Sequence, residues 1–245
     1  MIDYGLLVSM IIAFGVPSLV GSWWTVSGRD GPIGFFDVAL WPAFTGLAIG
    51  RITTLAIDDP SSIGRISDML IIRSGVEFWP GVTAAIGAAL LSAHLGLVSP
   101  SRRISELTPL AMVGYASYEA ACIFRDGCYG PRNSIGLRPP GLSTTMLPIG
   151  WFMTLAVVVA AFCVHVLVAR GRNPLEIVLV AAASVASIRT VGSIWLPHVG
   201  EGLTRQHLSS LVVAAASVFG VVVAVTTGVR RGEWESRQNR STANE

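Results

Sequence analysis

Residues 145–169 read TMLPIGWFMTLAVVVAAFCVHVLVA and contain no charged side chain. A helix needs about 20 predominantly apolar residues to cross the roughly 30 Å hydrocarbon core of a bilayer, so this stretch predicts a membrane-spanning helix. The composition agrees, because 52% of the 245 residues are hydrophobic and 13% are charged. Soluble domains carry about a quarter charged residues. We therefore expect an all-α membrane protein.

Apolar segments of similar length recur along the chain and predict seven spans. Their connectors contain glycine, proline and serine, which favour turns. The first segment lacks the basic leader of a signal peptide, so we expect it to be retained. We expect one seven-span domain over 1–228 and a polar, disordered, cytoplasmic tail over 229–245. The predicted spans are 4–26, 35–57, 76–98, 104–124, 145–169, 174–196 and 207–228.

The distribution of arginine predicts the orientation in the membrane. All 17 basic residues are arginine, and basic residues accumulate in cytoplasmic connectors. With the N-terminus outside, nine arginines fall on the cytoplasmic side and six in the outer connectors. We therefore expect the N-terminus outside and the C-terminus in the cytoplasm. The net charge of +2 is too small and too dispersed to indicate nucleic-acid binding.

Four charged residues fall inside the predicted spans, namely Arg51, Glu77, Glu119 and Arg189. Ionisable side chains within a membrane are costly and usually mark a functional site or a paired structural contact. In the expected orientation these residues and Tyr4 lie toward the outer leaflet, which predicts an outer-leaflet cavity. A set of Arg–Glu pairs that only hold helices together is the alternative. We expect Glu119 to pair with Arg51 or Arg189, because an isolated buried carboxylate would take up a proton.

The cysteines fall mostly in a polar connector, which reads YEAACIFRDGCYGPRNS over residues 118–134. Cys122 and Cys128 have no histidine or third thiol near them in sequence, whereas zinc requires four ligands. We therefore expect no metal. A disulfide is feasible on the oxidising outer face, and two free thiols are the alternative.

Glycine and arginine give the same connector another possible role. Gly127 and Gly130 supply a flexible backbone, and Arg125 and Arg132 supply guanidinium groups. A guanidinium group offers parallel donors that fit phosphate or carboxylate. We expect these residues to cover the outer-leaflet cavity and to contact an anionic head group.

The connector motif DGCYGPR resembles that of the prolipoprotein diacylglyceryl transferases, in which a glycine- and arginine-bearing signature ends in a Tyr-Gly pair, here Tyr129 and Gly130. IDYGLL is similar to the opening of the family's first span and puts its functional tyrosine at Tyr4. Gly50 and Arg51 match a pair in the second span. LTRQHLSS is similar to the Gln-x-Leu-Ser stretch before the last span.

The resemblance implies a multi-pass protein of the bacterial plasma membrane that takes part in lipoprotein biosynthesis. Members of the family transfer the diacylglyceryl group of phosphatidylglycerol to the cysteine thiol of a lipoprotein precursor. The implied partners are therefore a phosphatidylglycerol-like phospholipid and a lipoprotein precursor or another membrane enzyme. We expect no cofactor.

The sequence departs from the family pattern at positions that carry chemistry. The family's His-Gly-Gly motif falls on Trp79, Pro80 and Gly81, so the histidine expected to act as base is missing. The signature arginine falls on Glu119, although Arg189 matches an arginine of the sixth span. The resemblance therefore predicts the fold more directly than the chemistry.

The expected reaction needs a base, because a thiolate and not a thiol is the nucleophile. We expect Glu119 or Glu77 to act as this base, with Tyr4 as a third catalytic residue. The leading hypothesis is a membrane transferase that uses an anionic phospholipid. The alternatives are a catalytically inactive lipid-binding or scaffold paralogue that partners another membrane enzyme, and a transporter or channel. The expected substrate-binding residues are Arg51, Trp79, Arg125, Gly127, Tyr129, Gly130, Arg132 and Arg189.

Overall fold

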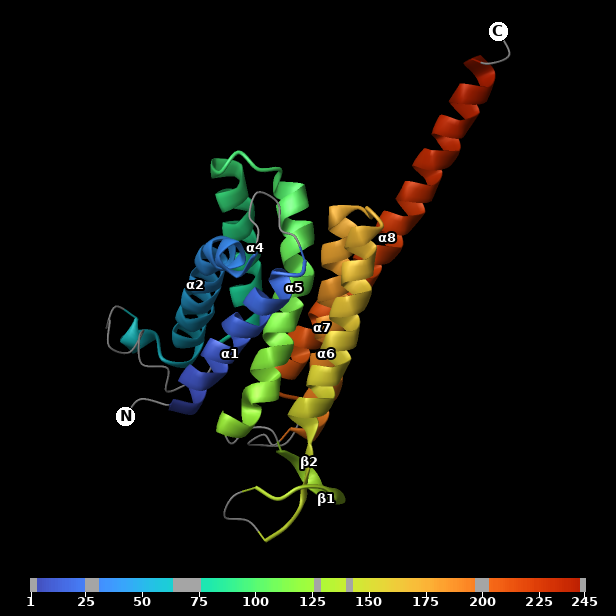
Figure 1. Ribbon diagram of the computed structural model, residues 1–245. Coiled ribbons are helices and arrows are strands. Elements are labelled where there is room, and N and C mark those ends of the chain that lie inside the picture. Colours follow the sequence, from blue (N-terminus) through green and yellow to red (C-terminus); the bar gives the residue numbers. More distant parts are fainter. Residues whose placement is uncertain are drawn as a thin grey trace.

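A computed structural model describes residues 4–24, 31–63, 76–125, 129–139, 143–196 and 203–242 of the chain. The described part is a bundle of long helices with a small two-stranded sheet at one end (Figure 1). The helices are α1 (Tyr4–Gly21), α2 (Gly31–Asp58), α4 (Phe78–Leu95), α5 (Pro100–Ala120), α6 (Ile149–Ala169), α7 (Pro174–Trp195) and α8 (Arg205–Thr242), with 3₁₀ segments η1 (Pro60–Ser62) and η2 (Ala121–Arg125).

Five helices in the described part are long and apolar enough to cross a membrane. The prediction of a helical membrane protein is therefore confirmed at this coarser level. The apolar part of α1, Leu7–Gly21, is shorter than a full span, and α5 carries charged residues close to both of its ends. Seven spans and the outward N-terminus stay predictions. The five helices cover Phe35–Asp58, Phe78–Leu95, Ile149–Ala169, Pro174–Trp195 and Arg205–Thr227.

Local sequence explains the tight connection between α6 and α7. Gly171 adopts φ +66°, a left-handed conformation that commonly ends helices. Pro174 then begins α7, where its missing N–H is not needed. The side chain of Asn173 accepts a hydrogen bond of 2.9 Å from the backbone N–H of Leu175. These features place α6 and α7 against each other as neighbours.

The last helix extends beyond its apolar part. The span-length apolar segment of α8 ends at Thr227, and helical backbone continues to Thr242. Glutamate, glutamine and arginine in this segment favour helix. Figure 1 shows the last part of α8 projecting beyond the other helices.

The connector after α5 also contains structure that was not expected. Strand β1 (Tyr129–Leu137) pairs antiparallel with β2 (Met146–Pro148), and Arg132 lies opposite Met146. Strand β2 leads directly into α6 at Ile149, whereas the sequence predicted the fifth span to begin four residues earlier. We call the end of the bundle that carries β1, β2 and the start of α6 the hairpin end.

The largest hydrophobic core lies among α5, α6 and α7. Val157 and Val164 of α6 and Ile177 of α7 are 0% exposed and belong to one buried cluster. Met112 and Ala116 extend this cluster along α5. The core therefore fixes the relative positions of α5 and α7, the two helices that carry Glu119 and Arg189.

Helices α2 and α4 approach each other through glycine. A Cβ atom added to Gly81 would lie 2.8 Å from the carbonyl oxygen of Gly46, and one added to Gly50 would lie 2.7 Å from the carbonyl oxygen of Glu77. Gly46 and Gly50 have the GxxxG spacing that lets membrane helices pack closely. This contact holds the start of α4 against the second half of α2.

Candidate functional site

An arginine–glutamate pair joins α7 to α5 near the hairpin end. Arg189 Nη1 lies 3.8 Å from Glu119 Oε1, and the two side chains are 16% and 15% exposed. Of the two partners expected for Glu119, the structure therefore provides Arg189. The distance is longer than the roughly 2.7–2.9 Å of a charge-assisted hydrogen bond. The pair is thus a loose contact that leaves hydrogen-bonding capacity on both groups.

Two aromatic side chains complete the surroundings of the Arg189 guanidinium. Nη1 donates a hydrogen bond of 2.7 Å to the hydroxyl of Tyr115, which also interacts with Glu119. The Arg189 Cζ atom lies 4.1 Å from the ring centroid of Phe78, the first residue of α4. A cation over an aromatic face is stabilised by the ring quadrupole. The guanidinium is therefore held between α4 and α5.

Arg125 forms a second cationic position next to this pair. Its Cζ lies 3.7 Å from the ring centroid of Tyr118, and its Nη2 donates a 2.7 Å hydrogen bond to the Tyr118 carbonyl. The Tyr118 hydroxyl is close enough to Glu119, Arg125 and Arg189 for all three charges to act on it. Ser9 of α1 donates a 3.2 Å hydrogen bond to the carbonyl of Ala121 and so holds η2 in place.

Both arginines keep unused donors within the described part of the chain. A guanidinium group carries five N–H donors. The buried Nε atoms of Arg125 and Arg189 have no hydrogen-bond partner among the residues that the structure describes. Buried donors usually find a partner, so each exception requires an explanation. An anionic ligand held by the two guanidinium groups beside Tyr118 would provide one.

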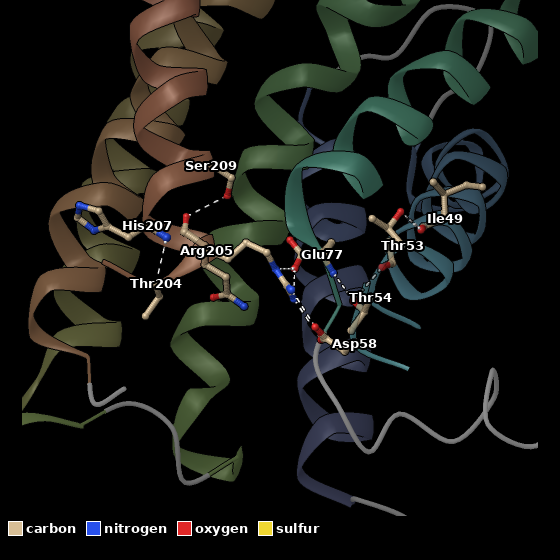
Figure 2. A network of polar contacts seen from close by, with 11 residues as sticks. Ile49, Thr53, Thr54, Asp58, Glu77, Thr204, Arg205, His207 and Ser209 are labelled. Carbon is tan, nitrogen blue, oxygen red and sulfur yellow. Dashed lines mark hydrogen bonds and ion pairs between the residues drawn. The ribbon is translucent and has the colours of Figure 1, made fainter. Parts of the chain in front are cut away.

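A separate ionic network joins α2, α4 and α8 at the hairpin end of the bundle (Figure 2). Arg205 Nη1 and Nη2 donate hydrogen bonds of 2.8 and 3.1 Å to the two carboxylate oxygens of Asp58. Arg205 Nε lies 2.7 Å from Glu77 Oε1, and Nη2 lies at the same distance. All three guanidinium nitrogens are therefore engaged, in contrast to those of Arg189. We call Asp58, Glu77 and Arg205 the outer network.

Glu77 and Trp79, two of the predicted site residues, both contact α8 in the structure. Glu77, a candidate base, is 6% exposed and paired with Arg205, so its carboxylate is already neutralised. Trp79, a candidate substrate-binding residue, donates a 3.0 Å hydrogen bond from its indole nitrogen to Ser210 of α8. Both residues act as contacts between α4 and α8.

The remaining predicted site residues are spread more widely than one cavity. Tyr4 is 71% exposed at the start of α1, and Arg51 is buried within α2. Tyr129 and Gly130 begin β1, where Gly130 is buried. Gly127 lies outside the described residues. Glu119, Arg125 and Arg189 are thus the predicted site residues that the structure brings together, around Tyr118.

Arg132 belongs to a different surface feature. It lines an open hollow of about 400 Å³ on the hairpin, together with Arg138 and several hydroxyl-bearing residues. None of Glu119, Arg125 and Arg189 lines this hollow. The expectation that Arg125 and Arg132 cover the same cavity is therefore not reproduced.

The state of Cys122 decides between the two alternatives for the connector cysteines, a disulfide or two free thiols. Cys122 is disulfide-bonded, and Cys163 is free. The chain contains one other cysteine, Cys128, which lies outside the described residues. Cys122 packs closely on Gly150 of α6, because a Cβ atom added to Gly150 would lie 2.4 Å from the Cys122 sulfur.

Thiol labelling of intact cells tests on which side of the membrane this disulfide lies. A Cys163→Ala variant should not react with a membrane-impermeant maleimide, because disulfide sulfurs are unreactive. A Cys122→Ser, Cys163→Ala variant leaves Cys128 as a single thiol and should be labelled, because disulfides persist on the oxidising outer face. Labelling of the double variant only after cell lysis would contradict the outward orientation of the hairpin end.

Sequence reasoning missed several residues of these contacts. Asp58 and Arg205 lie just outside predicted spans, where charges are usually solvated, and Arg205 alone of the two entered the prediction of orientation. Tyr115 and Phe78 lie four and one positions from predicted site residues, Glu119 and Glu77. A spacing of four residues puts Tyr115 and Glu119 on one helix face, and this signal could have identified Tyr115.

The sequence was compared with known proteins. No protein-family model matches it, and no curated protein matches it at a significant level. The resemblance to prolipoprotein diacylglyceryl transferases therefore rests on the motifs described above, and its functional content is a proposal.

Proposed function

We propose that this protein binds an anionic phospholipid at the hairpin end and acts on it as a membrane transferase of the diacylglyceryl transferase type. The observation that carries the proposal is the unused donor capacity of Arg125 and Arg189 beside Tyr118. Two partly satisfied guanidinium groups next to each other favour a ligand that carries negative charge. A phospholipid is the anion most available to a site between membrane helices.

Two observations support a substrate in the outer leaflet. The disulfide of Cys122 lies at the end of the bundle that would face an oxidising compartment. The excess of arginine on the opposite side supports the same orientation. We infer a bacterial plasma-membrane protein with its N-terminus outside, and phosphatidylglycerol is the anionic lipid implied by the sequence motifs.

Glu119 is the carboxylate best placed to serve as a base in this proposal. Its 3.8 Å separation from Arg189 leaves oxygen lone pairs able to accept a proton. In the implied reaction Glu119 takes the proton of an acceptor thiol, and the thiolate attacks the glyceryl carbon that is bonded to phosphate. The C–O bond to phosphate breaks, and glycerol phosphate leaves while Arg125 and Arg189 stabilise its charge.

A second candidate function is a catalytically inactive lipid-binding or scaffold protein that partners another membrane enzyme. The engagement of Glu77 by Arg205 favours it, because one of the two candidate bases is then removed from chemistry. The presence of Trp79 at the expected position of the family's histidine favours it as well, since an indole cannot act as a base. Both candidate functions use the anionic-lipid site, but only the transferase would convert the bound lipid into product.

Lipid binding separates this proposal from a structural role of the cluster. Native mass spectrometry of the purified protein should show a preference for phosphatidylglycerol over phosphatidylcholine. Arg189→Gln should weaken phosphatidylglycerol binding by about tenfold, since a hydrogen bond to a charged group contributes about 1.5–3 kcal/mol. Arg102→Gln is the matched control, because Arg102 is 70% exposed and pairs locally with Glu106.

The outcomes of this experiment decide between the candidates. Equal binding of the two lipids by the wild-type protein would exclude the anionic-lipid site. If the preference is present, phosphatidylglycerol labelled in its diacylglyceryl group should be incubated with a cysteine-containing acceptor peptide. Label on the peptide, together with release of glycerol phosphate, supports the transferase. Binding without transfer supports the lipid-binding protein.

A further inference from the structure

We propose that Arg205 is a positioning residue of the lipid site and acts on Arg189 through the start of α4. The inference rests on the proposed function. Within the described residues Arg205 contacts Asp58 and Glu77, and neither belongs to the cluster around Arg189. The connection runs through two consecutive residues, because Glu77 contacts Arg205 and Phe78 contacts Arg189.

The first step of this connection is the fixed position of the Glu77 side chain. Arg205 Nε and Nη2 both lie 2.7 Å from Glu77 Oε1. Asp58 holds the same guanidinium from the other side, as Figure 2 shows. A planar guanidinium bonded along two edges has little freedom to rotate. The Glu77 side chain, which is 8% exposed, is therefore held in one place.

The second step is the fixed backbone of Glu77. Its N–H lies 3.2 Å from the carbonyl oxygen of Gly50 and 2.9 Å from the hydroxyl oxygen of Thr54. Its carbonyl accepts a 3.3 Å hydrogen bond from the N–H of Gly81 in the first turn of α4. Side chain and backbone of Glu77 together determine where α4 begins and in which direction Phe78 points.

The third step is the contact of Phe78 with the lipid site. Its ring lies under the Arg189 guanidinium, with 4.1 Å between Cζ and the ring centroid. The next residue, Trp79, is bonded to Ser210 of α8 and so ties the same turn to the same helix as Arg205 does. The start of α8 therefore fixes the surface on which Arg189 rests, and Phe78 keeps the guanidinium turned toward Tyr115.

Loss of Arg205 would act on the site in two ways. The turn that holds Phe78 would lose its tie to α8 at Glu77. Glu77 would also become a buried carboxylate without its arginine, next in sequence to the ring that supports Arg189. It would then attract the Arg189 guanidinium and compete with the phosphate of a lipid. Both effects weaken lipid binding, although Arg205 is not expected to touch the lipid.

Phosphatidylglycerol binding by full-length variants in nanodiscs tests this role. Arg205→Gln and Phe78→Leu should each lower the affinity by about fivefold, and the double variant should lose no more than the larger single effect, because both act through one contact. Arg205→Lys restores a cation beside Glu77 and should recover most of the affinity. Arg172→Gln is the matched control and should change it by less than about twofold, because the exposed pair of Arg172 with Glu176 contributes little.

A second measurement keeps the inference separate from the proposed function. In lipid-free detergent, the shift in unfolding midpoint of the double variant Arg205→Gln, Arg189→Leu should differ from the sum of the shifts of the two single variants. Wild-type protein without a preference for phosphatidylglycerol would overturn the proposed function and leave this coupling intact. Additive midpoint shifts would overturn the positioning role, whatever the lipid result. The positioning role would also be overturned if the loss of affinity in the Arg205→Gln, Phe78→Leu double variant equalled the product of the two single losses.

Discussion

Replacement of Arg189 by leucine should abolish the preference for anionic lipid and lower the free energy of unfolding by about 3 kcal/mol. The loss of stability follows because Glu119, 15% exposed, would lose the arginine with which it pairs. The hydroxyl of Tyr115 would also lose its 2.7 Å hydrogen bond from Arg189. Chemical unfolding in detergent gives the stability, and native mass spectrometry gives the lipid preference.

The double variant Arg189→Leu, Glu119→Leu distinguishes a lipid site from a structural pair. It should recover most of the stability, because replacing both members of a buried pair with apolar residues is often neutral. It should not recover the lipid preference. Arg172→Leu is the control, since Arg172 is 60% exposed and pairs with Glu176 at 3.9 Å. Recovery of lipid preference in the double variant would show that Arg189 serves structure alone.

The other large effect is expected at the contact between α2 and α4. Gly81→Ala should lower the free energy of unfolding by about 1–3 kcal/mol. The added Cβ would lie 2.8 Å from the carbonyl oxygen of Gly46, and backbone cannot rotate away as a side chain can. The two helices must separate, which also displaces Glu77 and the turn that follows it. The change is measured by chemical unfolding of the purified protein.

A second glycine in the same helix provides the control. Gly87 also lies in α4, but a Cβ atom added there meets nothing within 4 Å. Gly87→Ala should therefore be neutral or stabilise the protein by up to about 1 kcal/mol, because alanine favours helix over glycine. Equal destabilisation by both substitutions would mean that helix contact through Gly81 is unimportant for stability.

The helical membrane character could be predicted because it depends on composition within single segments. The stretch 145–169 has no charged residue, and α6 occupies most of it as Ile149–Ala169. The small sheet could not be predicted in the same way. Six consecutive residues of β1 are exposed, so the strand lacks the alternation that identifies a half-buried strand. It depends on pairing with Met146–Pro148, which local sequence does not reveal.

The candidate site shows a similar division between what could and could not be predicted. A charge inside an apolar segment needs a partner, so a pair that includes Glu119 followed from sequence. The choice of Arg189 over Arg51 required the packing of α5 against α7. The outer network was missed, because Asp58 and Arg205 lie at segment ends and are far apart in the chain. Asp58 and Arg205 pair only because the fold brings the end of α2 next to the start of α8.

The outer network also has a consequence for biogenesis, because its members are synthesised at different times. Glu77 precedes Arg205 by 128 residues, and translation proceeds at about 5–20 residues per second, so about 6–26 s separate the two. During this interval the nascent chain holds Asp58 and Glu77 without their arginine. The turn that carries Phe78 acquires its ties to α8 only after that helix has left the ribosome. Completion of the proposed lipid site would thus be a late event of membrane insertion, and a chain released before residue 205 would lack the contacts of Arg205 with Asp58 and Glu77.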